Sequence, residues 1–124
     1  MVQFIKSPAI IKAAGTGGKV IREFFGQVNS QTTEVSIAYM KSPQGWLEPG
    51  QAPGFNEYTV VLKGKLLIKT KNKEYVVTEG QGIMTGIEEW VQYSTPFEGG
   101  AEYIAVCLPA FSPDIVNRDP ENNR

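Results

Sequence analysis

Short stretches of apolar and β-branched residues, separated by polar or glycine- and proline-rich turns, run along most of the chain. The alternation is clearest at 34–40, where Val35, Ile37 and Tyr39 fall on one face of a strand and the residues between them fall on the other. We expect about nine short strands, with turns roughly every 8 to 12 residues. This pattern predicts an all-β domain of the sandwich or closed-barrel type.

The predicted strands are 19–27 and 34–40, which form a hairpin, and 57–62, 65–70, 74–78, 83–85, 89–94 and 101–108. Near the start, apolar pieces at 2–5 and 9–11 suit an edge strand and a loose connection, because Gly and Pro interrupt them. Ser112-Pro113-Asp114 predicts one short helical turn. With 124 residues, we expect a single domain over 1–124, with a core at about 33–109, N-terminal strands at 1–32 and a polar tail at 110–124.

The predicted strand 57–62 is apolar on both faces after Tyr58. In an antiparallel barrel this indicates that the outer face is covered as well as the inner one. A second copy of the chain in a homodimer would cover it, and so would the N-terminal segment folded back. The residue pattern alone leaves both alternatives open.

The stretch 45–64 holds a loop rich in Pro and Gly, then Glu57, then an apolar run closed by Lys63-Gly64. An acidic residue at the head of a strand, with no oppositely charged neighbour in sequence, faces either solvent or a cavity. The apolar run that follows Glu57 favours a cavity.

This stretch resembles the first signature of the cupin family, small double-stranded β-helix barrels. That signature is a Gly, five residues, His-any-His, three or four residues, Glu, six residues and a Gly, and its spacing is matched by Gly45, Gln51, Pro53, Glu57 and Gly64. Gln51 and Pro53 stand where the two histidines belong, and the second cupin signature is retained only at Gly80. The resemblance covers about 33–109, implies a cupin-like jelly-roll barrel, and favours the homodimer.

Metal-binding cupins hold their ion with residues that correspond by position to Gln51, Pro53, Glu57 and Val91. One carboxylate, one amide and two apolar groups are a poor ligand set for a transition ion. Calcium on Glu57 with backbone carbonyls is the alternative, but that strand offers no second carboxylate at a useful spacing. We therefore expect no metal and no other cofactor.

The resemblance and the alternation of the strands together predict a pocket. Val91 faces inward by analogy, so Tyr93 and Glu89 share its face, while Glu57 and Thr59 face inward from their own strand. The predicted ligand-binding residues are Gln51, Glu57, Thr59, Val91 and Tyr93, with Glu89 near the mouth. Glu57 is also the candidate catalytic residue, because burial would raise its pKa. The competing interpretation is a structural carboxylate held by a backbone amide or a tyrosine hydroxyl.

The composition narrows the partners and the chemistry. The formal net charge of −1 and the mixed charges favour neither nucleic acid nor a membrane surface as a partner. The sequence contains no histidine, which excludes serine-histidine and cysteine-histidine catalysis and the two-histidine iron site. The start of the chain does not read as a signal peptide and no apolar run approaches the roughly 20 residues of a membrane span, so we expect a cytoplasmic protein. Cys107 reads as a small buried residue.

Three functions fit this sequence, and fold alone does not choose among them. The leading one is a metal-free cupin-like protein that binds a small polar molecule, such as a carbohydrate or a carboxylic acid derivative, through Gln51 and Glu57. The second is a proton-transfer isomerase or lyase with Glu57 as base and Tyr93 as acid. The third is a non-catalytic dimerising module whose barrel is filled by side chains.

Overall fold

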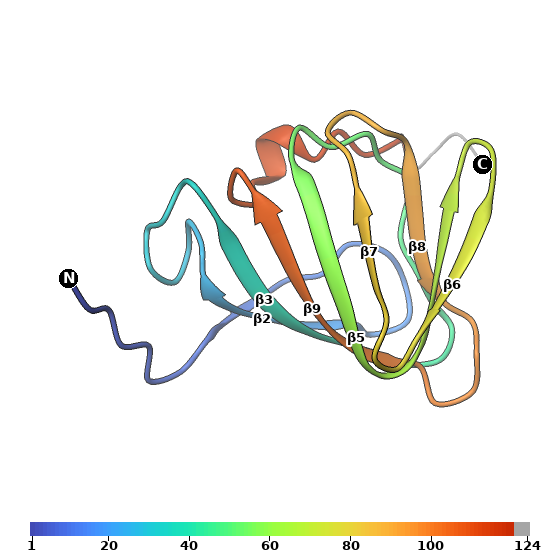
Figure 1. Ribbon diagram of the computed structural model, residues 1–124, viewed down its shortest axis with the longest axis horizontal. Coiled ribbons are helices and arrows are strands. Elements are labelled where there is room, and N and C mark those ends of the chain that lie inside the picture. Colours follow the sequence, from blue (N-terminus) through green and yellow to red (C-terminus); the bar gives the residue numbers. More distant parts are fainter. Residues whose placement is uncertain (121–124) are drawn as a thin grey trace.

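The predicted all-β architecture is confirmed by a computed structural model, which describes residues 1–120 (Figure 1). Nine antiparallel strands form one curled sheet within these residues. The strands are β1 (Ala9–Ile11), β2 (Val20–Phe25), β3 (Ser36–Ser42), β4 (Trp46–Leu47), β5 (Asn56–Thr70), β6 (Glu74–Thr78), β7 (Gly82–Thr85), β8 (Val91–Thr95) and β9 (Ala101–Leu108). One short 3₁₀ helix, η1 (Pro113–Ile115), follows β9, as the Ser-Pro-Asp sequence predicts.

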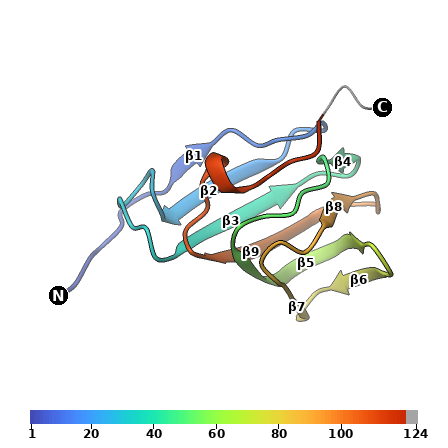
Figure 2. The same ribbon diagram turned by 90° about the horizontal axis from the view of Figure 1, so that it is seen from above.

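Strand β5 connects the two halves of the curled sheet. Its first part pairs with β9 and β7, and its second part pairs with β6 and β8. On one side the sheet continues from β9 through β3 and β2 to the edge strand β1, as Figure 2 shows from above, and on the other side β8 pairs with β4. The β2–β3 and β5–β6 hairpins form where turn residues separate the predicted runs.

Two predicted boundaries are wrong for identifiable reasons. The runs 57–62 and 65–70 are one continuous strand, because the chain passes Gly64 at a positive φ of 79° beside a shift of register between Val61 and Lys63. Strand β8 begins at Val91 rather than at Glu89, because Glu88 also has a positive φ and the Glu89 carboxylate accepts a hydrogen bond from the Gly86 amide. Both residues thus belong to the turn before the strand.

The hydrophobic core fills the half of the barrel formed by β4, β6, β8 and the second part of β5. Its fully buried centre includes Trp46, Val61, Leu66, Ile68 and Val91. A smaller cluster of Phe55, Cys107 and Val116 packs under η1. The other half of the barrel, toward β1, β2 and β3, keeps an internal space, and the candidate site lies there.

The C-terminal segment from η1 onward closes one end of this space. It forms backbone hydrogen bonds with the loop 48–55, from the Gly54 amide to the Ile115 carbonyl (2.6 Å) and from the Asp119 amide to the Gly50 carbonyl (2.8 Å). An isolated bridge pairs Gln51 with Arg118. The expected polar tail therefore packs against the barrel as far as the structure describes it, and positions 121–124 lie outside the described residues.

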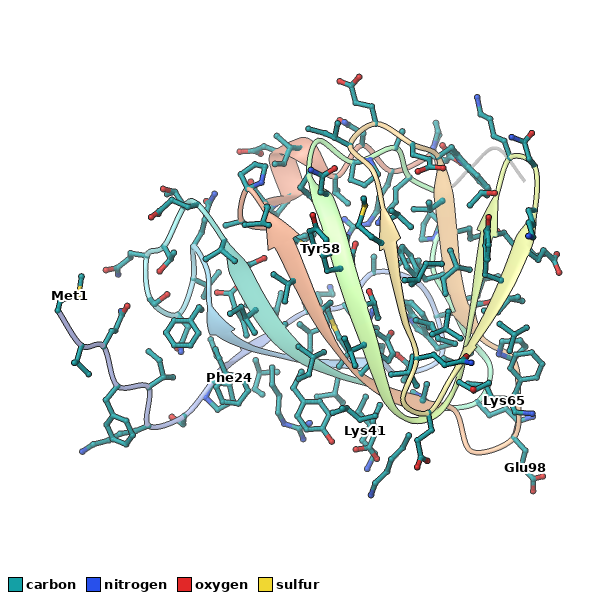
Figure 3. The ribbon with its side chains drawn as sticks, viewed as in Figure 1. Met1, Phe24, Lys41, Tyr58, Lys65 and Glu98 are labelled. Atoms are coloured by element: carbon teal, nitrogen blue, oxygen red, sulfur yellow. The ribbon has the colours of Figure 1, made fainter. Side chains whose placement is uncertain are left out.

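The outer face of β5 is apolar and exposed. Tyr58, Val60 and Leu62 have exposed fractions of 40%, 49% and 43%. Figure 3 labels Tyr58 at its place on β5, and Figure 1 shows the residues before β1 extending away from the barrel. The alternative in which the N-terminal segment covers this face is therefore wrong. Among residues 1–120, we find no helix with the length and apolar character needed to cross a membrane.

Candidate functional site

A cavity of about 70 Å³ lies inside the barrel between β2, β3, β5, β8 and β9. Apolar side chains form much of its wall, among them Ile11, Ile21, Ala38, Met40, Phe55, Ala105 and Phe111. Its charged and polar lining residues include Lys12, Lys19, Glu23, Glu48, Gln51, Glu57, Tyr93, Tyr103 and Arg118. An apolar wall with a few polar groups that converge on one space is the usual construction of a small-molecule site.

Glu57 reaches this cavity from the start of β5. Strand alternation turns Glu57, Thr59 and Val61 inward and leaves Tyr58 and Val60 outside. Burial raises the pKa of Glu57 to about 7, and the negative charge of Glu48 is the second cause of this shift. Lys19 and the Tyr93 hydroxyl act to lower the pKa. A carboxyl group with this pKa can give or take a proton near neutral pH.

Lys19 enters the cavity from the residue just before β2. Its Nζ lies 4.1 Å from the centre of the Trp46 ring and 5.4 Å from that of Tyr103, so two aromatic faces flank the ammonium. Burial alone would lower the pKa of Lys19, but Tyr103, Glu48 and Glu57 outweigh it and the net shift is upward. The side chain therefore stays positively charged.

Glu48 supplies a second carboxyl group, from the loop after β4. It is buried, and that burial raises its pKa although Lys19 and Arg118 oppose the shift. Gln51 follows in the same loop, and its amide and carbonyl pair with the backbone of Val91. The loop thus carries one acid and one amide into the cavity wall.

Two buried polar atoms in the wall have no hydrogen-bond partner among the described residues: Oε1 of Gln51 and Nε of Arg118. The two residues are neighbours, because an isolated β-bridge joins their backbones. A buried acceptor or donor without a partner is unfavourable, typically by about 1–3 kcal/mol. An acceptor and a donor in this state, on residues that line one cavity, mark a place where a polar group would gain binding energy.

Tyrosines supply neutral hydroxyl groups at two further points of the wall. Tyr93 on β8 shares a hydrogen bond with the Thr85 hydroxyl (2.9 Å), and Tyr103 on β9 shares one with Ser42 (2.8 Å). Burial is the main cause that raises the pKa of each phenol, so both stay protonated at neutral pH. These groups can donate hydrogen bonds but do not add negative charge.

The structure brings three of the predicted site residues to the cavity, namely Gln51, Glu57 and Tyr93. Thr59 and Val91 are buried but do not line it. Glu89 is exposed in the turn before β8 rather than placed at the mouth. A ligand-binding role of the five residues stays a prediction.

Sequence reasoning missed Lys19, Glu48, Tyr103 and Arg118 as site residues. Lys19 and Arg118 are distant from Glu57 in sequence and reach it only through the fold of the N- and C-terminal segments. Glu48 lies within the signature stretch, but a carboxylate in a Pro- and Gly-rich loop carries no local sign of burial. Strand alternation, which indicated that Glu57 faces inward, does not exist in that loop.

The cavity does not suit a transition metal in the manner of metal-binding cupins. Pro53 and Val91 offer no donor at two of the four family positions, and Lys19 places a cation beside Glu48 and Glu57. Within residues 1–120, no group of three or more His, Cys, Asp and Glu side chains is arranged to hold an ion.

No family model matches the sequence. A curated protein named endoribonuclease YbeY, from Myxococcus xanthus, is 34% identical over 107 residues, which cover 86% of this chain. The chain spans only 36% of the length of that relative. The name of the relative therefore describes a protein of which most lies outside the match.

Solved structures that resemble this chain share its architecture at low sequence identity. The polyketide cyclase RemF from Streptomyces resistomycificus superimposes with a TM-score of 0.74 at 12% identity, covering 99% of this chain and 89% of its own. An RmlC-like cupin from Shewanella frigidimarina gives a TM-score of 0.71 at 16% identity, covering 91% and 94%. At these identities the likeness concerns the fold.

Proposed function

Since the chain has the cupin fold, as its sequence predicted, we propose that it binds a small polar organic molecule in the cavity beside Glu57. The observation that carries this proposal is a cavity in which Gln51 and Arg118 present buried polar atoms without partners next to a titratable carboxyl group. A barrel that served only to dimerise would have its interior filled by side chains, and the cavity counts against that interpretation. The proposal involves no metal or other cofactor.

A thermal-shift screen of small acids, amides, polyols and sugars at pH 7 tests this function. We expect at least one compound to raise the melting temperature by several degrees, because a ligand at about 100 times its Kd contributes about 2.7 kcal/mol. Glu57→Ala should lose that shift, whereas Glu79→Ala, a change of an exposed acid in the β6–β7 turn, should keep it. A screen without any stabilising compound, or a shift that Glu57→Ala retains, would contradict the proposal.

A second candidate is proton transfer on the bound molecule, an isomerase or lyase activity. The pKa of about 7 at Glu57 favours it, because a general base works best when its pKa is near the working pH. Tyr93 would then donate a hydrogen bond as a neutral phenol. Loss of turnover in Glu57→Gln, with ligand binding and melting temperature retained, distinguishes this candidate from simple binding.

The ribonuclease name of the Myxococcus relative is not extended to this chain. The net charge of −1 of this chain and its lack of histidine offer neither a basic surface for RNA nor an imidazole for acid–base cleavage.

We also propose that two copies of the chain pair through the exposed apolar face of β5. Location in the cytoplasm stays a prediction.

A further inference from the structure

Lys19 is a charged residue of the cavity to which the proposed function assigns no role. Its ammonium is positioned by the rings of Trp46 and Tyr103, and the Trp46 indole is itself anchored by a hydrogen bond to the Ala14 carbonyl (3.2 Å). A lysine held in this way loses less side-chain entropy on binding a partner than a free surface lysine does. The ammonium is thus pre-positioned as a donor.

Arg118 adds a second cation from the opposite end of the chain. Its Nε is buried without a partner among the described residues, so the guanidinium is not fully used by the protein itself. Guanidinium groups bind carboxylates through parallel hydrogen bonds, which are among the strongest in proteins. Arg118 and Lys19 both line the cavity together with Glu48, and both cations act to lower the pKa of that carboxyl group.

Carboxyl groups lie beside the two cations of the cavity, and burial disfavours their negative charge. Glu48 is buried near both cations, and Glu57, with its pKa of about 7, is neutral for a large fraction of the time at neutral pH. Of the other charged lining residues, Lys12 is exposed, and Glu23 accepts hydrogen bonds from the Val28 (3.0 Å) and Asn29 (2.9 Å) amides. Burial raises the pKa of Glu48 as well as that of Glu57, so both carboxyl groups near the two cations favour their neutral forms more than exposed glutamates do.

The size of the cavity limits what can enter. Its volume of about 70 Å³ is about half of the roughly 150 Å³ of an apolar cavity that holds a benzene ring. A pyranose ring is larger than benzene and does not fit this volume. A carboxylate that carries one or two further carbon atoms does fit.

On the basis of the ligand-binding function above, we propose that the ligand is a small carboxylate whose charged group is held by Lys19 and Arg118. Lys19 thereby provides, within the protein chain, the positive charge that a metal ion provides in other cupins. The unpartnered Gln51 Oε1 is placed to accept a hydrogen bond from a hydroxyl group of a hydroxy acid.

Isothermal titration calorimetry of the full chain at pH 6.5 tests the inference with matched pairs of probes. Acetate, glycolate and pyruvate are each compared with the corresponding neutral amide. We expect a carboxylate to bind at least about tenfold more tightly than its amide, because a charge-assisted hydrogen bond contributes more than a neutral one. Ethylamine and ethylene glycol serve as a cationic and an uncharged probe.

Variants at Lys19 assign the contact. Lys19→Met should weaken the binding of the carboxylate by about tenfold or more, Lys19→Arg should restore part of it, and Lys65→Met should leave it unchanged. Lys65 is a matched control, because its ammonium also lies over an aromatic ring, that of Phe97 (5.7 Å), but outside the cavity. If Lys19→Met fails to fold, the comparison of carboxylate with amide on the unmodified chain still shows whether the cavity prefers a carboxylate.

The outcomes separate the two proposals. If the diol, an amide or the amine binds while the carboxylates do not, or if Lys19→Met binds a carboxylate as well as the parent does, the inference is wrong but the ligand-binding function stands. If no probe binds and the thermal-shift screen also finds nothing, both are wrong.

Discussion

Glu57 carries an ionisable group into an environment that favours its neutral form. The cost of ionising this carboxyl group inside the barrel appears as a pKa of about 7, compared with 4.5 for an unperturbed glutamate. Because the folded chain holds the proton more tightly than the unfolded chain does, folding takes up a proton between these two values. The stabilising contribution is therefore present below pH 4.5 and is lost as the pH rises through 7.

Replacement of Glu57 by Gln should remove this dependence on pH. Gln is neutral at every pH. The free energy of unfolding of Glu57→Gln minus that of the parent should therefore be higher at pH 8 than at pH 5, by about 1–3 kcal/mol. Urea denaturation at the two pH values measures the difference. Glu79→Gln, on the exposed β6–β7 turn, serves as the control and should show no such change. Equal effects of Glu57→Gln at both pH values would contradict the burial of this charge.

The sequence could identify some site residues and not others. Glu57, Gln51 and Tyr93 were found because signature spacing and strand alternation are local properties of the chain. Lys19 and Arg118 could not be found in this way, because their places depend on how the two terminal segments fold against the barrel. Long-range assembly of this kind leaves no periodic trace in a single sequence.

Strand β5 determines the shape of the sheet, since it takes part in both halves. The change of partners along it coincides with Gly64, whose positive φ and close approach to the Gly100 carbonyl need a residue without a side chain. A bulged glycine at the point where a strand bends is a common device for curving a sheet. The continuity of β5 is therefore compatible with the turn-like sequence Lys63-Gly64.

Gly64→Ala should destabilise the protein far more than Gly80→Ala. Both glycines have a positive φ, 79° and 82°, so each alanine costs about 1 kcal/mol or slightly more from its backbone conformation. At Gly64 the added Cβ would also come close to the backbone of Gly100 and Ala101, whereas at Gly80 nothing lies within 4 Å. We expect a loss of more than about 3 kcal/mol at Gly64, measured by chemical denaturation. Similar losses at the two sites would show that the close contact is absent.

The predicted strands are largely correct where a polar turn separates two apolar runs, as at the β2–β3 and β5–β6 hairpins. They are wrong at Gly64, which was expected to end a strand but lies within β5. They are also wrong at Glu89, which was expected to begin a strand but lies in the turn before β8. Strand β4 was not predicted, because two residues within a loop carry no periodicity. A polar turn between two apolar runs thus marks a strand end in the sequence, whereas a glycine alone does not distinguish a turn from a bulge.

The barrel as a whole presents one broad apolar surface to the outside. Tyr58 lies directly opposite Met84 on β7 and Val106 on β9, so these side chains share a face with Val60. Leu62, at the shift of register that follows, is also exposed. Contiguous exposed apolar patches of this kind are uncommon on monomeric proteins unless they bind something. A self-complementary contact between two copies would cover the patch on both at once.

A charge placed on this surface should separate the two copies. We expect the parent chain to sediment as a dimer and Val60→Arg as a monomer, because an unpaired charge in an apolar interface is strongly unfavourable. Val76→Arg is a matched control, since Val76 on β6 has an exposed fraction of 47% compared with 49% for Val60 but lies outside the patch. A monomeric parent in analytical ultracentrifugation at micromolar concentration, or a dimer that survives Val60→Arg, would contradict the proposal.

The indole of Trp90 donates a hydrogen bond to Asp119 (3.0 Å), at the point where the last described residues rest on Gly50. The chain has only one other tryptophan, Trp46, which lies buried beside Lys19. The emission spectrum of the native chain therefore combines a core fluorophore that contacts Lys19 with one that contacts the C-terminal segment. Replacing one tryptophan by phenylalanine leaves the fluorescence of the other. Trp46 then reports changes around Lys19, and Trp90 reports changes in the packing of the C-terminal segment.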